Sequence, residues 1–198
     1  FILDYLISLY ERDKLPNKIL LSGKKGIGKS LLVKQFMYNI QQDLSSKLLV
    51  ENETNSNILN IKRKNDKKNI EIDQMREIIK FTNQSSFNNK ARFVVIDDVE
   101  HLNINSSNAL LKSLEEPNLN VYFFLVYNSE MNILKTIKSR CLEFKLFLNL
   151  HETKLIVDNY FSDNVYDNIN ANLKNYYSTP KFLISLINFL KENNLSIS

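Results

Sequence analysis

Apolar residues along this chain follow two spacings, one typical of strands and one typical of helices. Continuous apolar runs, rich in β-branched and aromatic residues, predict strands that are buried on both faces of a parallel sheet. These runs lie at 19–21, 58–61, 93–96, 121–127 and 142–144. Between the runs, apolar residues recur every three or four positions, which predicts helices.

The helical segments alternate with the strands. They lie at 1–13, 31–40, 73–82 and 105–116. Asp73 is expected to cap its helix, and Pro117 is expected to end the last of these helices. Strands that alternate with helices predict an α/β fold, with a parallel sheet flanked by helices. In the polar stretch 43–69 only the strand is predicted, and the basic run 62–68 is more typical of a solvated loop than of a binding site.

The pattern changes near residue 148. Beyond it only helical spacing is found, in segments at 152–161, 165–177 and 181–192. We therefore expect an α/β domain over residues 1–148 and a small all-helical domain over residues 149–198. No apolar run reaches the length of a membrane span, so we expect no membrane association.

All three glycines of the chain lie in one segment, between the first predicted strand and a predicted helix. The segment reads Gly23-Lys24-Lys25-Gly26-Ile27-Gly28-Lys29-Ser30. Glycine at positive φ lets the backbone N–H groups of such a loop converge on an anion, and the following helix adds its positive end. In this motif Lys29 reaches the β- and γ-phosphates and Ser30 ligates Mg²⁺. A Gly/Lys-rich surface turn is the alternative, which the position of the motif between strand and helix disfavours.

Composition and charge exclude some kinds of site but do not indicate a function. A net charge of +4 tolerates the proximity of nucleic acid without indicating it. The chain contains only five arginines, so an arginine at a telling position carries more weight than a lysine. The one cysteine, Cys141, excludes an internal disulfide and a multi-cysteine zinc site, and a cytoplasmic setting is the simplest expectation.

Four polar residues stand at the ends of predicted strands. Asp97 and Asp98 end a buried strand, where the carboxyl edge of a parallel sheet would let Asp97 hold Mg²⁺ and Asp98 polarise an attacking water. Asn128 follows the next strand, and its amide could orient that water. Arg140 is expected to begin the last strand. Each position has a plainer interpretation: an acidic strand end that caps a helix, a turn residue, and a surface arginine.

Several segments resemble the clamp-loader branch of the AAA+ ATPases. The most specific are Asn-Ala-Leu-Leu-Lys-Ser-Leu-Glu-Glu-Pro at 108–117 and Ser-Arg-Cys at 139–141, and the segment 70–78 is also similar. The resemblance covers nearly the whole chain. It implies a nucleotide-binding domain and a helical lid, with ATP and Mg²⁺ as cofactors. It also implies a hetero-oligomeric ring of clamp-loader subunits that places a sliding clamp on primed DNA.

The resemblance also assigns roles to residues. Residues 23–30 match the Walker A loop, and Leu31 is the last nucleotide-binding position. Asp97 matches the metal-holding acid of Walker B, and Asn128 matches sensor 1. Arg140 matches the arginine finger, which acts in trans at the nucleotide site of a neighbouring subunit. Lys181 matches the basic residue of sensor 2 in the lid.

The chain departs from the family pattern in three respects. Asp98 stands where the motor subunits have glutamate, which weakens the case for hydrolysis at its own site. Many members place four cysteines between the Walker A helix and the Walker B strand. Residues 41–92 contain none, so no zinc is expected. The family's collar-forming third domain is not found before Ser198, so we expect either that the sequence is truncated or that the gene product is unusually short.

We therefore expect an ATP-binding clamp-loader subunit that supplies Arg140 in trans and hydrolyses ATP only weakly. The alternatives are the motor ATPase subunit of the same loader, a scaffold that no longer uses nucleotide, and a stand-alone P-loop kinase. A glutamate beside Asp97 would favour the motor subunit. The loss of Lys29 would favour the scaffold, and a pocket for an acceptor substrate would favour the kinase. A DNA contact at Asn105–Ser106 is weighed against a plain N-cap, and the N-cap is preferred.

Overall fold

The computed structural model describes residues 2–41, 44–83, 91–115, 118, 120–176, 179–193 and 195. Residues of the predicted features that lie outside this part of the chain include Phe1, Asp43, Glu116, Pro117 and Tyr177. None of the helices in the described part has the length and apolar character needed to cross a bilayer.

Contacts divide the chain into two compact units. The first comprises Phe1–Ser22 and Lys29–Lys145, and the second comprises Gly23–Gly28 and Leu146–Ser198. The glycine-rich motif therefore passes from one unit to the other between Gly28 and Lys29. The domain boundary expected at residue 148 stays a prediction.

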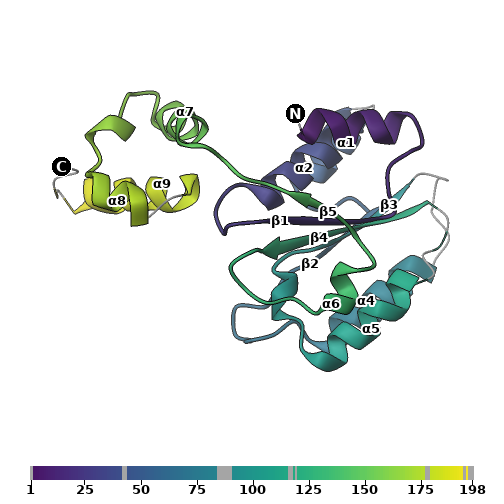
Figure 1. Cartoon of the computed structure of the whole chain (residues 1–198). Coiled ribbons are helices and arrows are strands. Elements are labelled where there is room, and N and C mark those ends of the chain that lie inside the picture. Colours follow the sequence, from purple (N-terminus) through teal and green to yellow (C-terminus); the bar gives the residue numbers. More distant parts are fainter. Residues whose placement is uncertain are drawn as a thin grey trace. The chain divides into compact units, whose positions relative to one another are not determined.

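The first unit is built on a five-stranded sheet with the strand order β2-β3-β4-β1-β5 (Figure 1). The pairs β2–β3, β3–β4 and β1–β5 are parallel. The elements of this part follow in the order α1 (Ile2–Glu11), β1 (Lys18–Gly23), α2 (Lys29–Asn39), α3 (Leu44–Glu51), β2 (Ile58–Ile61), α4 (Ile72–Asn83), β3 (Arg92–Ile96), η1 (Val99–His101), α5 (Ile104–Glu115), β4 (Val121–Asn128), α6 (Lys135–Lys138) and β5 (Leu142–Lys145).

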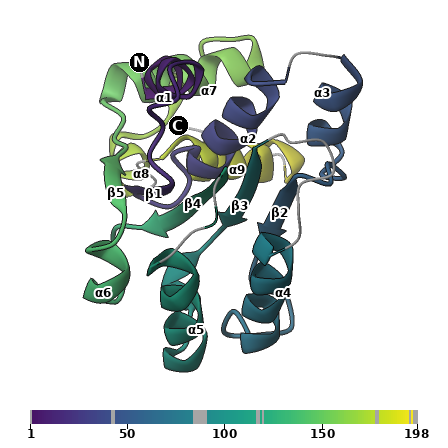
Figure 2. The ribbon, with the colours of Figure 1, turned by 90° about the vertical axis from the view of Figure 1, so that its right-hand side faces the viewer.

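Helices cover both faces of this sheet, α1 and α2 on one face and α4 and α5 on the other (Figures 1 and 2). Successive side chains of a strand point to opposite faces, so each strand contributes to two cores. On the first face the Phe36 ring of α2 lies 6.2 Å from the Phe93 ring and 5.2 Å from the Phe124 ring, between centroids. The core on the second face includes Ile61, Met75, Ile78, Val94, Ile96, Leu110, Leu114, Phe123 and Leu125.

This architecture confirms the predicted α/β fold and its parallel sheet. Each of the five predicted strands coincides with an observed strand to within two residues at either end. The predicted helices at 1–13, 31–40, 73–82 and 105–116 correspond to α1, α2, α4 and α5. The central strands were predictable because burial on both faces demands uninterrupted apolar residues.

Two predictions about helices of this unit are wrong. Helix α3 lies in the polar stretch where only a strand was expected. Asp73 does not cap α4: it lies in the first turn of that helix, where its carboxylate accepts a hydrogen bond from Arg76 at 2.7 Å. The backbone N–H of Glu71 instead donates to Gln74 Oε1 at 3.1 Å, so the start of the helix is satisfied by a side chain from within it.

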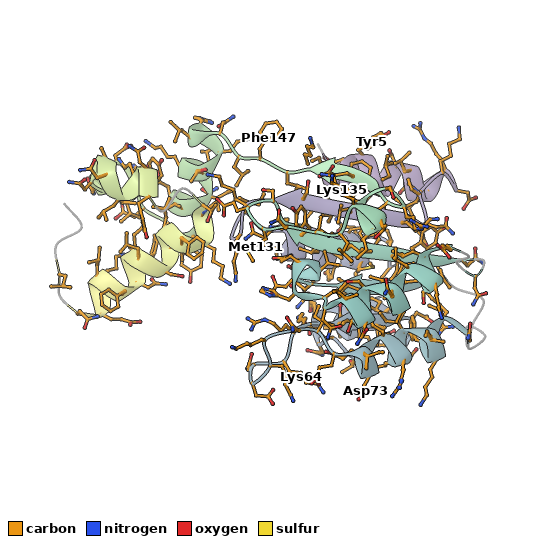
Figure 3. All side chains as sticks on the ribbon, turned by 60° about the horizontal axis from the view of Figure 1, so that its bottom comes forward. Tyr5, Lys64, Asp73, Met131, Lys135 and Phe147 are labelled. Atoms are coloured by element: carbon orange, nitrogen blue, oxygen red, sulfur yellow. The ribbon has the colours of Figure 1, made fainter. Side chains whose placement is uncertain are left out.

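The second unit contains α7 (Leu150–Phe161), η2 (Tyr166–Asn168), α8 (Ala171–Tyr176) and α9 (Pro180–Glu192). Asn149 caps α7 through a reciprocal pair of hydrogen bonds with Glu152. The one helix predicted at 165–177 is in fact divided into η2 and α8. The small core of this unit consists of Val157, Val165, Tyr166, Ile169, Leu183 and Ile187. Phe147, labelled in Figure 3, precedes these helices with 82% of its surface exposed.

Candidate nucleotide-binding site

The glycine-rich loop has the backbone conformation that an anion cradle requires. Gly26 has φ +90° and Gly28 has φ +96°, a region that residues with a Cβ rarely adopt. Apart from Gly28 itself and its two chain neighbours, no described residue has an atom within 4 Å of a Cβ built on Gly28. Glycine is therefore needed at position 28 for its backbone angles and not for lack of space.

At Gly26 the loop also lies against the start of α9, within the second unit. A Cβ built on Gly26 would lie 2.6 Å from Thr179 Oγ1 and 3.1 Å from Lys181 Cβ. The backbone N–H of Lys181 donates to the carbonyl of Gly26 at 3.2 Å. Lys181, predicted as a nucleotide contact, thus binds the loop through its backbone, and its side chain is exposed.

Ser30 and Asp97 lie together in the first unit, as a magnesium pair would require. Ser30 Oγ donates to Asp97 Oδ2 at 2.8 Å, and the backbone N–H of Asp98 donates to Asp97 Oδ1 at 3.1 Å. The first bond joins the start of α2 to the end of β3. Mg²⁺ is usually held by one or two carboxylates together with substrate phosphates and water, and this donor set fits that pattern.

Lys29, the first residue of α2, is buried among acidic residues. Its exposed fraction is 7%. Burial lowers the pKa of its ammonium group, and the carboxylates of Glu100, Asp97, Asp98 and Glu130 partly oppose this effect. The electrostatic surroundings of Lys29 therefore come from the strand end that was predicted and from two acids that were not.

Of the residues that follow Asp97, the sequence predicted a role in the site only for Asp98. That residue has φ +55° and ψ +47°, so the chain turns sharply there and enters the short helix η1. Glu100, within η1, reaches the end of β4, where the backbone N–H of Asn128 donates to Glu100 Oε2 at 3.2 Å. Sequence reasoning missed Glu100, and its place three residues after Asp97 was the only available signal.

Asn128 ends β4 as predicted, close to these acids. Its side-chain oxygen accepts a hydrogen bond from the backbone N–H of Glu130 at 3.2 Å. This bond orients the amide group, leaving the side-chain NH₂ as the donor that could face a water or a phosphate. The structure thus brings Asn128 and Asp98 to the same edge of the sheet. The backbone N–H of Asn128 contacts Glu100, and that of Asp98 contacts Asp97.

Arg140 does not begin a strand. It lies in the turn between α6 and β5, where its side chain is 36% exposed. Its guanidinium donates to Glu115 Oε1 at 2.8 Å and to the carbonyl of Thr136 at 3.1 Å. The arginine therefore lies at the surface, where an ion pair holds it. The sequence had predicted that it begins a strand, but β5 begins two residues later.

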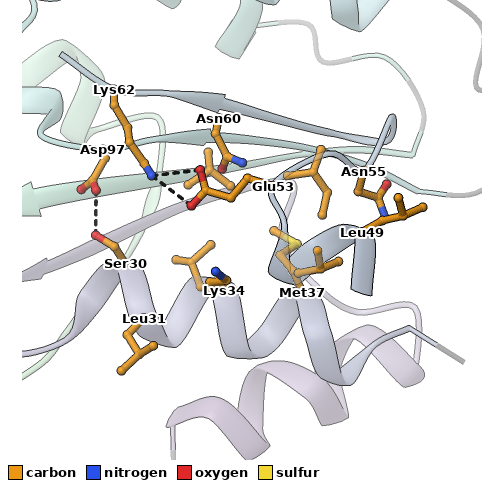
Figure 4. A pocket seen from close by; sticks show the side chains of 14 residues that line it. Ser30, Leu31, Lys34, Met37, Leu49, Glu53, Asn55, Asn60, Lys62 and Asp97 are labelled. Carbon is orange, nitrogen blue, oxygen red and sulfur yellow. Dashed lines mark hydrogen bonds and ion pairs between the residues drawn. The ribbon is translucent and has the colours of Figure 1, made fainter. Parts of the chain in front are cut away.

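A pocket of about 250 Å³ borders the Ser30–Asp97 pair (Figure 4). It lies between α2, α3, β2 and β3, and an ion pair between Lys62 and Glu53, with 3.3 Å between charged atoms, stands at its side. The pocket depends on α3 and could not be predicted without that helix. Its apolar lining includes Val33, Met37, Leu49, Val50, Ile58 and Val95.

The start of α5 has the character of an ordinary capped helix. Asn103 Oδ1 accepts from the backbone N–H of Ser106 at 2.8 Å, and the Ser106 hydroxyl donates to the carbonyl of Ile70 at 2.9 Å. Ser106 has no exposed surface. These bonds agree with the N-cap interpretation, because the amide that could hold a DNA phosphate already has a partner.

Comparison with known proteins shows that the chain is similar to subunits of bacterial DNA polymerase III. It is 38% identical over 76 residues to the DNA polymerase III subunit delta' of Pseudomonas aeruginosa, covering 38% of this chain and 23% of that one. The subunit delta' of Buchnera aphidicola subsp. Schizaphis graminum is 30% identical over 202 residues, which is 95% of this chain and 59% of the relative. The subunit gamma of Buchnera aphidicola subsp. Acyrthosiphon pisum is 34% identical over 64% of this chain and 37% of the relative.

Solved structures share the fold. A DNA polymerase III gamma subunit-related protein of Thermotoga maritima matches with a TM-score of 0.61 and 22% identity, over 84% of this chain and 52% of that one. The RuvB Holliday junction branch migration motor of the same organism matches with a TM-score of 0.58 and 19% identity, over 100% of this chain and 63% of that one. The chain spans less than two thirds of the length of each of these proteins.

A family model matches the N-terminal three quarters of the chain. It is described as DNA polymerase III, delta subunit, and it matches residues 1–149. The match includes the glycine-rich loop, both acids after β3, Asn128 and Arg140. The chain therefore belongs to the DNA polymerase III, delta subunit family.

Proposed function

We propose that this chain is an ATP-binding, delta-prime-like subunit of the bacterial DNA polymerase III clamp loader. In this role it helps to load the sliding clamp onto primed DNA. The observation that carries the proposal is the bond between Ser30 and Asp97, beside the buried ammonium of Lys29. These groups would meet the phosphates of ATP at the positions that the glycine-rich motif requires.

Each residue of the motif has a distinct task in binding. The backbone N–H groups of residues 23–31 hold phosphate oxygens, and the N-terminal end of α2 adds positive potential. Lys29 reaches the β- and γ-phosphates, while Ser30 and Asp97 ligate Mg²⁺. Bound Mg²⁺ supplies positive charge that offsets the charge developing on the phosphate oxygens during transfer. Lys181 adds a basic group from α9.

The residues at the carboxyl edge of the sheet would orient a water. Asp98 is shorter by one carbon than the glutamate of the motor subunits, and the amide of Asn128 acts beside it. Because a neighbouring arginine is needed for full charge stabilisation, hydrolysis by the isolated chain is expected to be very slow. Brisk ATP hydrolysis by the purified monomer would contradict this proposal.

Arg140 would act outside its own subunit. Its side chain is partly exposed and its ion pair with Glu115 lies at the surface, so the guanidinium would exchange this partner for the γ-phosphate bound by a neighbouring protomer in a hetero-oligomeric ring. Partners of this kind are expected to be other clamp-loader subunits. The sliding clamp and primed DNA would be reached through the assembled complex, in the bacterial cytoplasm.

A second candidate is a gamma/tau-like motor subunit of the same loader. The gamma relative quoted above is 34% identical over 64% of this chain, a higher identity than the 30% of the Buchnera delta' relative, although the delta' match covers 95% of this chain. The two candidates differ in the rate at which the subunit's own site turns over in a complete complex. A complex that contains the Lys29→Ala subunit and is otherwise wild type separates the two. Its ATPase rate should fall by the share of one catalytic site if the chain is a motor, and should change little if it is not.

Binding of ATP is the direct test of the proposed site. In Lys29→Ala we expect ATP affinity to fall on the order of 100-fold, because charge-assisted hydrogen bonds contribute about 1.5–3 kcal/mol each. Lys34→Ala is the matched control: it removes the same charge from the same helix, and Lys34 Nζ instead donates to the carbonyl of Glu51 at 2.9 Å. Calorimetric titration measures both. A wild-type chain that binds no ATP would refute the proposal.

A further inference from the structure

The start of α9 is capped by the glycine-rich loop and not by its own side chain. Thr179 occupies the N-cap position of this helix, where a threonine hydroxyl commonly accepts the backbone N–H of the second or third helical residue. The Thr179 side chain makes no such bond. The N–H of Lys181, the second residue of the helix, donates instead to the carbonyl of Gly26 at 3.2 Å. The loop therefore supplies the acceptor that Thr179 would otherwise provide.

This arrangement leaves the Thr179 hydroxyl buried beside the loop. The residue is 3% exposed, and its Oγ1 has no hydrogen-bond partner among the described residues. A Cβ built on Gly26 would lie 2.6 Å from that oxygen, so the hydroxyl and the loop are in close contact. A buried polar group without a partner costs free energy. The Gly26 carbonyl and the Thr179 hydroxyl are thus two acceptors for one donor, and the carbonyl holds it.

The same bond fixes the orientation of a peptide group in the loop. The carbonyl of Gly26 and the N–H of Ile27 belong to one peptide unit, and none of the described peptide bonds is cis. In a planar trans peptide the C=O and N–H point in opposite directions, so anchoring the carbonyl on α9 directs the Ile27 N–H away from that helix. Glycines at positions 26 and 28 give this peptide wide freedom to rotate, and an external anchor is needed to select one orientation.

We propose that the bond from Lys181 to Gly26 holds the Ile27 N–H toward the phosphates of ATP, and that the Thr179 hydroxyl takes the Lys181 N–H when this bond opens. The inference rests on the proposed ATP-binding function and deepens it. Residue 181 is then a positioning residue that acts through its backbone, separately from its ammonium group. When the bond opens, the peptide between Gly26 and Ile27 rotates and the loop loses one amide donor for phosphate. All four residues belong to the second unit.

Proline and alanine at position 181 separate the backbone N–H from the side chain. Lys181→Ala removes only the ammonium group, whereas Lys181→Pro also removes the N–H, at a helix position in the first turn where proline is tolerated. ATP affinity should be about tenfold lower in Lys181→Pro than in Lys181→Ala, because the loop loses one oriented donor to a charged oxygen. Inorganic pyrophosphate, which has no base or ribose, should give the same ratio. Calorimetric titration measures both ligands.

The matched control is the next residue of the same turn. Phe182 is 40% exposed, and the loop bond is made by the N–H of Lys181 and not by that of Phe182. Phe182→Pro and Phe182→Ala should therefore differ about twofold or less in ATP affinity. Nuclear magnetic resonance adds a direct readout: the amide signal of Ile27 should shift on pyrophosphate binding in Lys181→Ala and shift much less in Lys181→Pro.

Thr179→Val tests the unused hydroxyl without touching the loop bond. Valine keeps the branched shape of threonine, and the loss of an ordinary N-cap bond lowers the melting temperature by about 2–4 °C in a chain of this size. We expect no decrease in Thr179→Val, because the hydroxyl makes no bond to lose. A decrease of that size would show that Thr179 caps α9 itself, and the inference would be overturned.

The affinities decide the remaining outcomes. Equal ATP affinity in Lys181→Pro and Lys181→Ala would overturn the inference. An equal difference between proline and alanine at positions 181 and 182 would overturn it too, because the effect would then come from distortion of the helix. If the wild-type chain binds neither ATP nor pyrophosphate, the proposed function fails. If it binds ATP and the two variants at position 181 agree, only the role of the bond to Gly26 fails.

Discussion

The hydroxyl of Ser30 donates a hydrogen bond to Asp97 Oδ2 at 2.8 Å, although 67 positions separate the two residues in the chain. Hydroxyl and carboxylate oxygens are both ligands that Mg²⁺ accepts, so this bond brings together the two side chains that would hold the ion. The relationship joins the helix after the phosphate loop to the strand that carries the acids.

Ser30→Ala should weaken ATP binding only when Mg²⁺ is present. The lost ligand is expected to cost about 1–2 kcal/mol, or about tenfold in affinity, in Mg²⁺ and almost nothing in EDTA. Parallel calorimetric titrations in the two buffers measure the difference. Ser8→Ala, on α1, is the control because its hydroxyl donates only to the carbonyl of Tyr5 in its own helix, at 2.8 Å. An equal loss in EDTA would mean that Ser30 supports the loop and not the metal.

Arg140→Ala should leave the chain folded and able to bind ATP. The ion pair with Glu115 is partly exposed, with side-chain exposures of 36% and 52%, and such pairs contribute about 0–1 kcal/mol. The ATPase rate of a reconstituted complex should instead fall about 10³-fold or more at the neighbouring site. Urea unfolding and steady-state hydrolysis measure the two effects separately.

Arg76→Ala provides the comparison for this arginine. Arg76 forms an exposed ion pair with Asp73, with 2.7 Å between charged atoms, on a different helix of the same unit. It should change stability by a similar small amount and leave the ATPase rate of the complex intact. If both substitutions reduced hydrolysis equally, the effect would come from net charge, and the trans role of Arg140 would be rejected.

The sheet was predictable from sequence because its central strands are buried on both faces, which restricts their residues to apolar types. Val94, Ile96, Phe123 and Leu125 are fully or almost fully buried, and only uninterrupted apolar runs satisfy such positions. Helix α3 was not predictable in the same way. Its apolar residues follow no strong helical stripe, and its place depends on contacts with α2 that the local sequence does not encode.

The residues of the candidate site likewise fall into those that the sequence could predict and those that it could not. Lys29, Ser30 and Asp97 were found because the motif fixes their spacing within one loop or at one strand end. Glu100 could not be predicted, because its contact with the end of β4 arises from a left-handed turn at Asp98 that brings η1 against a residue 28 positions away. Long-range partners of this kind become visible only when the order of strands is known.

Gly26→Ala should detach the loop from the start of α9. A Cβ at this position would lie 2.6 Å from Thr179 Oγ1, and the backbone at φ +90° is itself unfavourable for alanine. We expect the Lys181 N–H, which donates to the carbonyl of Gly26, to lose protection from amide exchange. Gly28→Ala carries the backbone strain without a clash and should leave that protection largely intact.

A second substitution identifies the clash as the cause. Thr179 is 3% exposed and its hydroxyl has no hydrogen-bond partner among the described residues, so Thr179→Ala removes the obstructing atom without breaking a bond. In Gly26→Ala combined with Thr179→Ala, protection of the Lys181 N–H should partly return. Independent, additive effects of the two substitutions would contradict a direct contact between positions 26 and 179.

Cys141 should react slowly with alkylating reagents at neutral pH. Burial raises the pKa of its thiol to about 11, against a smaller opposing effect of Lys18. The reactive species is the thiolate, and a pKa two units above the ordinary value of 9.0 lowers its fraction about 100-fold. Iodoacetamide labelling at pH 8 should therefore be much slower for the folded chain than for the chain in urea. Equal rates would show that the thiol is not protected by the fold.

The same pKa makes the stability of the fold depend on pH. The unfolded thiol loses its proton near pH 9, while the folded thiol keeps its proton until about pH 11, so the folded state binds more protons between these values. The contribution of Cys141 to the free energy of unfolding is thus fully present below pH 9 and is lost as pH rises toward 11. Burial also raises the pKa of Tyr10, Tyr122 and Tyr166, which act in the same direction. The contribution of the thiol is therefore obtained by subtracting the pH profile of Cys141→Ala, and a difference that stays constant from pH 8 to 11 would refute it.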